Sequence, residues 1–370
     1  MSGFRSLVSR ARGHVLSAVY NLYVLFFSWE TTVVGTLQGG VSPTKVLLVM
    51  DRNGRTERDL LRRLFGNSWE KADTRRVFLP GVRRYGRRLP PGVAFCVLEI
   101  PEFWAGFMSG IFQIQLPEFV RQTLDLTGGL TAVKQRIQSS RRRSTFNQIV
   151  REKKFSYRLG TTAQDIENFY HHMYVPHVRE QFGSAAWMST LERMKSRADA
   201  QIFYVNDGTR DVAGELIAIR NGTLFRFNNG VVSGHTSQGW QDVGNALYAQ
   251  AILFGIEMGL QKMDMGLSRP FLNDGVYLYK RSWGAGVELD PLANATLYLA
   301  NPHNSEAARQ FLEITPMAVF SGEGLVARWH TASNLEGIDW GQADKAYRSP
   351  GLRGLHTFAQ DGQTRREFNC

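Results

Sequence analysis

The sequence has few cysteines, and this scarcity limits how the protein can be stabilised. Only two occur in 370 residues, Cys96 and Cys370. Two thiols are too few for a disulfide framework, so a reducing compartment fits best. Cys96 lies in the apolar run FCVLEI, which is typical of a core residue. We therefore expect a cytoplasmic protein that is stabilised by an apolar core.

Long apolar runs are also missing. The longest, from Val15 to Trp29, is shorter than the roughly 20 residues of a membrane-spanning helix. It follows Arg5, Arg10 and Arg12, and no small-residue cleavage site of a signal peptide is evident. Two interpretations stay open. We favour a helix that runs into a first buried strand, LYVLFF; the alternative is an amphipathic helix held peripherally at the inner face of an anionic membrane.

Acidic residues are scarce in the first part of the chain. Residues 1–160 carry 26 Lys/Arg and 11 Asp/Glu, a net charge of +15, whereas residues 161–370 carry 18 and 22, a net charge of −4. The densest basic cluster is Arg141, Arg142 and Arg143. This asymmetry favours an acidic partner such as tRNA, an anionic membrane or a phosphorylated substrate, although a solvated basic surface explains it equally well.

Alternating apolar and turn-forming segments predict a mixed α+β fold. TKVLLVM, GVAFCVLEIP and GIFQIQLP have the composition of buried strands, and RTERDLLRRLFG has helical spacing with a glycine stop. One or two basic helices are expected between residues 130 and 154, followed by a strand, FSYRLG. Asn206-Asp207-Gly208 and Asn221-Gly222 separate three apolar runs, which predicts an antiparallel meander.

The second half of the chain continues with an amphipathic helix. Apolar residues step by three and four from Trp240 to Met258, and the short strand LQKMDMG follows. GVELDPLANATLYLA predicts a hairpin or a strand pair, and SEAARQFLEIT predicts a helix. The remaining residues are polar and Gly-rich, so we expect a mostly irregular tail. The predicted domains are 1–139 (basic), 140–300, and 301–370 (helix and tail).

Residues 264–284, DMGLSRPFLNDGVYLYKRSWG, concentrate unusual side chains in one short segment. These are Tyr277, Tyr279, Lys280, Arg281 and Trp283. A helix start with tyrosine in the core, cations in water and tryptophan as a packing residue would explain them without a functional site. The alternative is that the segment carries chemistry.

Four segments resemble the GNAT N-acetyltransferase core and, more narrowly, the acyltransferase domains related to Fem-type peptidoglycan bridge transferases. They are RRRSTFNQIVREKKFSYRLG, GELIAIRNGTLFRFNNGVV, ALYAQAILFGIEMGLQKMDMG and GVYLYKRSWGA. The resemblance implies a GNAT-like fold, with a central mixed sheet flanked by helices and a degenerate first copy in tandem. It also implies transfer of an acyl group from acyl-CoA, in the first place acetyl-CoA, to a small-molecule or lipid-linked amine of a cell-envelope or metabolite precursor, without a metal.

The resemblance implies roles for the aromatic and basic residues of the closing segment. In GNAT-like enzymes a tyrosine near the start of the last helix can protonate the leaving thiolate. Tyr277 and Tyr279 match this position; they point to different faces of a helix, so only one can serve, and we prefer Tyr279. Lys280 and Arg281 can bind a phosphate or carboxylate. The predicted substrate contacts are Lys280, Arg281, His172 and Tyr174.

A base is also needed, because an attacking ammonium must lose a proton. Glu215 in the central hairpin and Asp264 at a strand end are candidates, although a strand-end Asp often caps the next turn. His171, His172 and His177 are a third source. HHMYVPH lacks the spacing of a known metal site, so we predict no metal.

The donor site is expected at the N-terminus of the helix that begins near residue 239, where backbone N–H groups can bind a pyrophosphate. The predicted donor contacts are Ser237, Gln238, Gly239, Gly244 and Asn245. The loop HTSQGWQDVG departs from the Gln/Arg-x-x-Gly-x-Gly pattern, and Asp242 would repel a phosphate. Two alternatives therefore stay open: an aminoacyl-tRNA donor, as in Fem-type relatives, or a catalytically inactive module that binds anionic lipid or nucleic acid.

Overall fold

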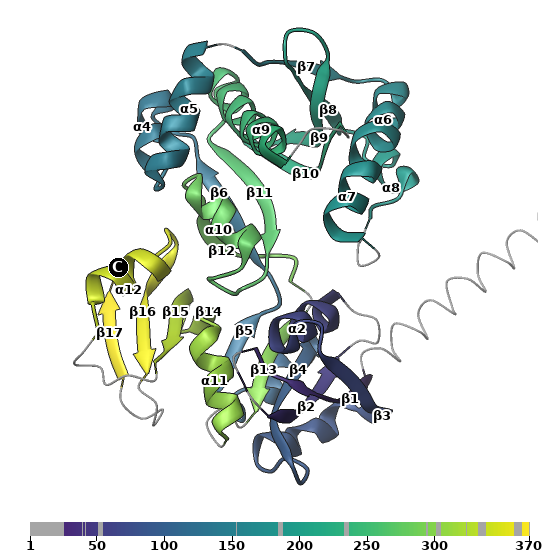
Figure 1. The fold of residues 1–370 in the computed structure, drawn as a ribbon, viewed down its shortest axis with the longest axis vertical. Helices are drawn as coiled ribbons and strands as arrows, with labels where there is room; N and C mark the ends of the chain where they lie inside the picture. The colour runs from purple at the N-terminus through teal and green to yellow at the C-terminus, as the bar shows by residue number, and fades with distance from the viewer. Residues whose placement is uncertain are drawn as a thin grey trace, which may run out of the picture.

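The fold combines three sheets with flanking helices (Figure 1). The computed structural model describes residues 26–38, 40, 42–50, 55–152, 154–183, 188–232, 237–293, 295–300, 305–322, 324–331, 338–358 and 365–369. The second sheet lies in the upper part of Figure 1, the first at the lower right and the third at the lower left. The predicted mixed α+β class is confirmed.

The first sheet has the strand order β3-β1-β2-β4-β13-β5. Its strands are β1 (Phe27–Thr36), β2 (Pro43–Met50), β3 (Trp69–Phe78), β4 (Val93–Pro101), β5 (Ile114–Pro117) and β13 (Ala295–Ala300). The predicted strands therefore appear as β2, β4 and β5. Helices α2 (Arg55–Phe65) and α11 (Glu306–Ile314) pack on one face, and η1 (Leu79–Gly86) and α3 (Glu102–Met108) on the other.

The second sheet has the order β12-β6-β11-β10-β9-β8-β7. Its strands are β6 (Val120–Asp125), β7 (Ser156–Gly160), β8 (Gln201–Asn206), β9 (Asp211–Arg220), β10 (Thr223–Val231), β11 (Lys262–Ser268) and β12 (Gly286–Leu289). The predicted meander is β8-β9-β10. Asn221 and Gly222 both have positive φ, 47° and 71°, as a two-residue type I′ hairpin turn requires.

Helices cover both faces of the second sheet. On one face lie α4 (Gly129–Arg136), α5 (Ser140–Glu152) and α9 (Ser237–Glu257), with α10 (Gly275–Ser282) near β6 and β11. On the other lie α6 (Ala163–Phe169), η2 (Tyr170–Tyr174), α7 (Val175–Phe182) and α8 (Leu191–Lys195). The order β8-β9-β10-α9-β11-α10 is the one that the resemblance to GNAT-like acyltransferases predicts.

Both sheets end in the same arrangement. In the first, β2 is parallel to β4, and the antiparallel strands β13 and β5 follow. In the second, β10 is parallel to β11, and the antiparallel strands β6 and β12 follow. The third strand of each series comes from the other half of the chain, so the halves exchange β6 and β13. This repeated order agrees with the predicted tandem arrangement.

Two expectations for the end of the chain are wrong. Residues 286–300 form no hairpin, because β12 pairs with β6 whereas β13 is buried at all six positions between β4 and β5. The tail is not irregular: β14 (Met317–Ser321), β15 (Gly324–His330), β16 (Leu352–Phe358) and β17 (Arg365–Asn369) form the third sheet, with α12 (Trp340–Tyr347). Its apolar runs are short because its strands have only five to seven residues, and alternate residues of β14 and β15 pack into two different apolar clusters.

The predicted first strand, LYVLFF, overlaps the start of the described residues only in part. Strand β1 begins at Phe27, so only the end of LYVLFF falls within it. The helix expected before it lies outside the described residues. Within the described ranges, none of the helices has both the length and the apolar character needed to cross a membrane.

Candidate active site

The two parallel strands at the centre of the second sheet pair only briefly. Strands β10 and β11 are in register from Thr223 and Lys262 to Phe225 and Asp264, and then separate. Beyond this point β10 is bulged between residues 226 and 228 on its other edge, and Gly266 in β11 has a φ of 78°. Strands that diverge leave backbone and side-chain groups available between them. We call the parts of the two strands that are unpaired with each other, residues 226–231 of β10 and 265–268 of β11, the splay.

A buried ion pair lies beside the splay. Nε and Nη2 of Arg226 on β10 donate to the two carboxylate oxygens of Glu215 on β9 at 2.6–2.8 Å. The Arg226 guanidinium also lies 3.8 Å from the centroid of the Tyr248 ring on α9. Burial opposes the charge, but Glu215 holds the pKa of Arg226 above its usual value. Nη1 of Arg226 is buried without a hydrogen-bond partner among the described residues, so it can donate to a ligand.

Lys280 on α10 is buried beside the unpaired part of β11. Its Nζ donates to the carbonyl oxygen of Leu267 at 2.9 Å and to Oγ of Ser268 at 3.2 Å. Burial, reinforced by Arg226, lowers the pKa of Lys280 to about 7. A Cβ on Gly266 would lie 4.0 Å from Nζ. At neutral pH this amine is therefore divided between its charged and neutral forms, as a general base should be.

The two tyrosines of α10 face different surroundings, as their spacing predicts. Tyr277 is fully buried, and its hydroxyl donates to Oγ of Ser349 at 2.8 Å. Tyr279 lies against α9: its hydroxyl donates to Oδ1 of Asn245 at 3.3 Å, and its ring meets Tyr248 edge-on at 5.0 Å. Burial raises the pKa of Tyr279 well above its usual value, so the phenol keeps its proton at neutral pH.

Arg142 connects α5 to Tyr279. Its guanidinium lies 4.7 Å from the centroid of the Tyr279 ring, Nη1 donates to Asn245 Oδ1, and Nε donates to Ser282 Oγ at 3.3 Å. Its neighbours Arg141 and Arg143 are exposed. Of these three consecutive arginines, Arg142 therefore contacts the buried site residues, whereas Arg141 and Arg143 lie on the surface.

The predicted donor contacts lie at the start of α9. Residues 237–239 begin the helix, as expected, but their side chains lie outside the described residues. Gly244 and Asn245 face the predicted catalytic tyrosine: a Cβ on Gly244 would lie 4.0 Å from the Tyr279 hydroxyl. The structure thus brings the beginning of α9 and α10 together.

Asp264 and Glu215, the two predicted carboxylate bases, are both buried. Asp264 Oδ1 accepts from the N–H of Gly266 at 2.7 Å, and Oδ2 pairs with Arg121. Asp264 therefore caps the turn at the end of the paired part of β11, which is the structural alternative raised by the sequence. Glu215 is engaged by Arg226 on both oxygens. In this arrangement each carboxylate holds an arginine.

The remaining predicted substrate contacts lie away from this cluster. Arg281 donates to the carbonyl oxygen of Ala346. His172 is exposed on η2, whereas Tyr174 is buried and its hydroxyl accepts from the N–H of Ser189 at 2.8 Å. Of the four, Lys280 lies against β11 at the splay, and the Tyr174 hydroxyl accepts from Nδ2 of Asn228 on the unpaired part of β10 at 3.3 Å. Nowhere in the described parts of the chain do three or more His, Cys, Asp or Glu side chains gather as a metal site would require.

The sequence analysis missed Arg226 and Tyr248. A signal for Arg226 was available, since it is the one charged residue within the apolar alternation TLFRF. Tyr248 lies among apolar residues of the α9 pattern, and nothing in its spacing separates it from a core aromatic.

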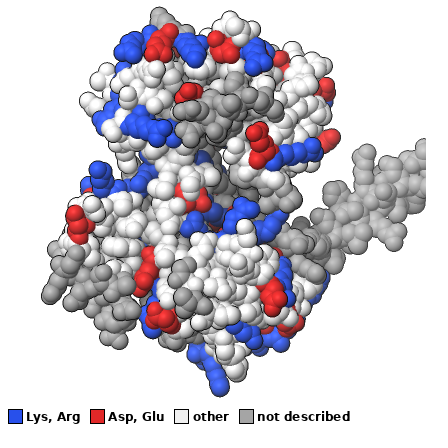
Figure 2. Space-filling view, viewed as in Figure 1, with Lys and Arg blue, Asp and Glu red and all other residues white. Residues whose placement is uncertain are grey.

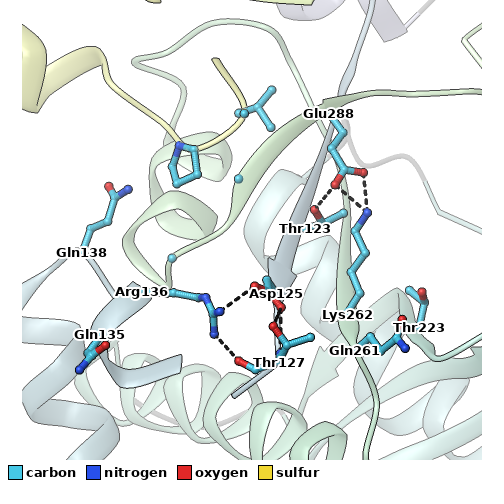
Figure 3. A pocket seen from close by; sticks show the side chains of 15 residues that line it. Thr123, Asp125, Thr127, Gln135, Arg136, Gln138, Thr223, Gln261, Lys262 and Glu288 are labelled. Atoms are coloured by element: carbon cyan, nitrogen blue, oxygen red, sulfur yellow. Dashed lines mark hydrogen bonds and ion pairs between the residues drawn. The ribbon is translucent and has the colours of Figure 1, made fainter. Parts of the chain in front are cut away.

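A second candidate site is a cavity of about 720 Å³ near the N-terminal ends of β10 and β11, opposite the splay. Its charged side chains pair with one another: Arg136 Nη2 with Asp125 at 2.7 Å, and Lys262 with Glu288 at 2.6 Å (Figure 3). The charged side chains of the cavity are paired in this way, whereas Nη1 of Arg226 beside the splay has no hydrogen-bond partner among the described residues. We therefore take the splay as the candidate active site.

The basic part of the sequence, residues 1–160, does not belong to one sheet alone. Residues 1–160 include every strand of the first sheet except β13, but also β6 and β7 of the second sheet and the helices α4 and α5 that cover it. Figure 2 shows the Lys and Arg side chains of the described chain in both the upper and the lower part of the molecule. A shallow groove of about 470 Å³ along α5 is lined by Arg143 and Arg151 together with Ser, Asn and Gln side chains.

Comparisons with known proteins give distant likenesses. No family model and no curated protein matches the chain. Among solved structures it is similar to L-PGS from Bacillus licheniformis (11% identity, 72% of this chain and 83% of that chain, TM-score 0.37). It is also similar to FemX (8%, 74% and 85%, TM-score 0.39) and to a GCN5-related N-acetyltransferase from Kribbella flavida (13%, 95% and 79%, TM-score 0.28). These include the kinds of protein that the four sequence segments resemble.

Proposed function

We propose that this chain is an N-acyltransferase and that the splay between β10 and β11 is its active site. The observation that supports this most is the pair of consecutive residues Tyr279 and Lys280. One is a phenol that keeps its proton, the other an amine with a pKa of about 7, and both are close enough to Arg226 to respond to its charge. Acid and base catalysis need two groups with separated pKa values of this kind.

The proposed reaction assigns one task to each side chain. The neutral Lys280 amine donates two hydrogen bonds, to Leu267 and Ser268, so its lone pair is free to take a proton from the attacking ammonium. The new C–N bond forms as charge develops on the acyl oxygen, to which Arg226 Nη1 donates. The bond to the leaving group breaks, and that group takes the Tyr279 proton. The nitrogen of the new amide loses its second proton to solvent, solvent returns a proton to the Tyr279 phenolate, and Lys280 releases the proton that it took.

The donor is proposed to be an acyl-CoA, with acetyl-CoA first. Its phosphates would be bound by the N-terminus of α9 and by the exposed Arg141 and Arg143 of α5, which packs against α9. The acceptor is an amine on a small-molecule or lipid-linked precursor of the cell envelope or of a metabolite. An aminoacyl-tRNA donor is the second candidate, favoured by the basic groove along α5, which suits a longer phosphate backbone.

The test measures thiol release from acetyl-CoA in the presence of a panel of amines, beside calorimetric titration of acetyl-CoA, longer acyl-CoAs and free CoA. Lys280→Met and Tyr279→Phe should each lower turnover by roughly 100-fold with donor binding retained, because each acts on a proton in the transition state. Tyr277→Phe, on the same helix but facing Ser349, is the matched control and should keep its rate.

Calorimetry also separates the alternatives. If no acyl-CoA or CoA binds but charged tRNA does, the donor is the second candidate. If neither binds, the chain is not a transferase of this kind and the inactive-module interpretation gains support.

A further inference from the structure

Six aromatic side chains form a connected cluster at one edge of the first sheet. They come from the start of β1, the end of β3 and α3, and we call them the aromatic patch: Phe26, Phe27, Phe78, Phe103, Trp104 and Phe107. Adjacent ring centroids lie 5.2–6.2 Å apart along the cluster. Because three separate elements supply the rings, the fold itself builds this surface.

The aromatic patch is open to solvent. Phe103 is 70% exposed, Phe78 50%, Phe107 43% and Phe27 38%. Single exposed apolar side chains are ordinary on a protein surface, whereas a contiguous group of large ones marks an interaction site. Trp104 packs against the core beneath the patch, which includes Val77 on β3 and Met108 on α3, and so anchors the exposed rings to the fold.

Arginines border the aromatic patch. The Arg83 guanidinium on η1 lies 4.3 Å from the centroid of the Phe107 ring, and Arg84, Arg87 and Arg88 are exposed on the same segment. Rings that can enter the headgroup region, beside guanidinium groups that can bind lipid phosphates, fit the surface of an anionic bilayer. The described chain begins within the patch, and the 25 residues before it contain three arginines and most of the longest apolar run of the sequence.

We propose that the aromatic patch is the surface by which this chain docks on an anionic lipid bilayer. Phe103 and Phe107 enter the headgroup region, and the arginines at 83–88 pair with lipid phosphates. The proposal concerns where the chain is held and stands apart from the acyl-transfer chemistry, since none of these residues borders the splay.

The test is flotation of the full chain with vesicles of mixed phosphatidylglycerol and phosphatidylcholine, compared with pure phosphatidylcholine. We expect binding to the anionic vesicles alone. The double variant Phe103→Ser/Phe107→Ser should bind about tenfold more weakly, because two exposed rings no longer enter the bilayer. Met258→Ser, which removes a 54% exposed apolar side chain from the turn that follows α9, is the matched control and should bind as the unmodified chain does.

The role of the arginines and the insertion of the aromatic patch into the bilayer can be tested separately. Replacing Arg83, Arg87 and Arg88 with Gln should weaken binding by about fivefold per charge at low salt, with the difference shrinking as salt rises. Arg141→Gln/Arg143→Gln, a similar change on α5, should have little effect. Quenching of tryptophan fluorescence by brominated lipid should be lost in Trp104→Phe.

Three results would overturn the proposal. One is anionic-vesicle binding that survives all the patch variants, which would assign it to residues 1–25 or to α5. Another is the absence of vesicle binding by the unmodified chain. The third is a dimer in sedimentation that Phe103→Ser/Phe107→Ser dissociates, which would assign the patch to a second copy of this chain.

Discussion

The free energy of unfolding should depend on pH through Lys280. In the folded chain its ammonium is buried among Leu267, Ser268 and Arg226, which lowers its pKa from the ordinary 10.5 to about 7. An unfolded chain restores the ordinary value. Between these two pKa values the unfolded state binds more protons than the folded state, so stability must increase as pH rises through this window.

The magnitude follows from the separation of the two pKa values. Each pKa unit corresponds to about 1.4 kcal/mol, so raising the pH from about 6 to about 9 should stabilise the fold by about 2.5 kcal/mol through this one group. Lys280→Met keeps an unbranched side chain of similar length but cannot titrate. Its unfolding free energy should therefore lack this gain.

The assay is urea unfolding of both proteins at several pH values across this range. The difference in unfolding free energy between the unmodified chain and Lys280→Met should shift by about 2.5 kcal/mol in favour of the unmodified chain at high pH. The variant also loses the hydrogen bonds to Leu267 and Ser268. This loss changes its unfolding free energy by a similar amount at every pH, so it does not produce the expected change with pH. Parallel curves for the two proteins would refute the reasoning, since Lys280 would then titrate at its ordinary pKa.

Three further predictions concern the surroundings of the site. Trp283→Ala should lose about 3–5 kcal/mol of stability in the same unfolding assay, because a fully buried indole that stacks on Tyr248 leaves a large cavity. Tyr277→Phe should lose about 1 kcal/mol, the usual value of one buried hydrogen bond, with the reaction rate unchanged. Arg141→Gln/Arg143→Gln should raise the Kd for a phosphate-bearing donor by an amount that falls with salt, whereas Arg142→Gln should also slow turnover, because Arg142 packs on Tyr279. A loss in Arg141→Gln/Arg143→Gln that persists at high salt would contradict the electrostatic role.

Local patterns account for the parts of the fold that were predicted. The Asn221-Gly222 turn sets the register of β9 and β10, which places Arg226 opposite Ile217. Residues two apart on a strand share a face, so Glu215 lies diagonally across from Arg226. The ion pair could therefore have been predicted from the hairpin, had its one internal arginine been weighed.

Other features depend on residues far apart in the chain. The exchange of β6 and β13 depends on which sheet each strand joins, and no local spacing encodes that choice. Arg142 meets Asn245 across 103 positions through the packing of α5 on α9. The burial of Lys280 likewise depends on the carbonyl of Leu267 and on the surrounding helices. In the sequence Lys280 looks like an exposed cation near the end of a short helix.

The proposed pairing of Lys280 and Tyr279 as base and acid is tested most directly by the pH dependence of kcat/KM. The reaction is acetyl-CoA-dependent acylation of the best amine, measured for the unmodified chain and for Lys280→Met. For the unmodified chain kcat/KM should rise with pH through about 7, as Lys280 loses its proton, and Lys280→Met should lack this rise while keeping any limb that belongs to the amine itself. Identical profiles and rates for the two proteins would contradict the account.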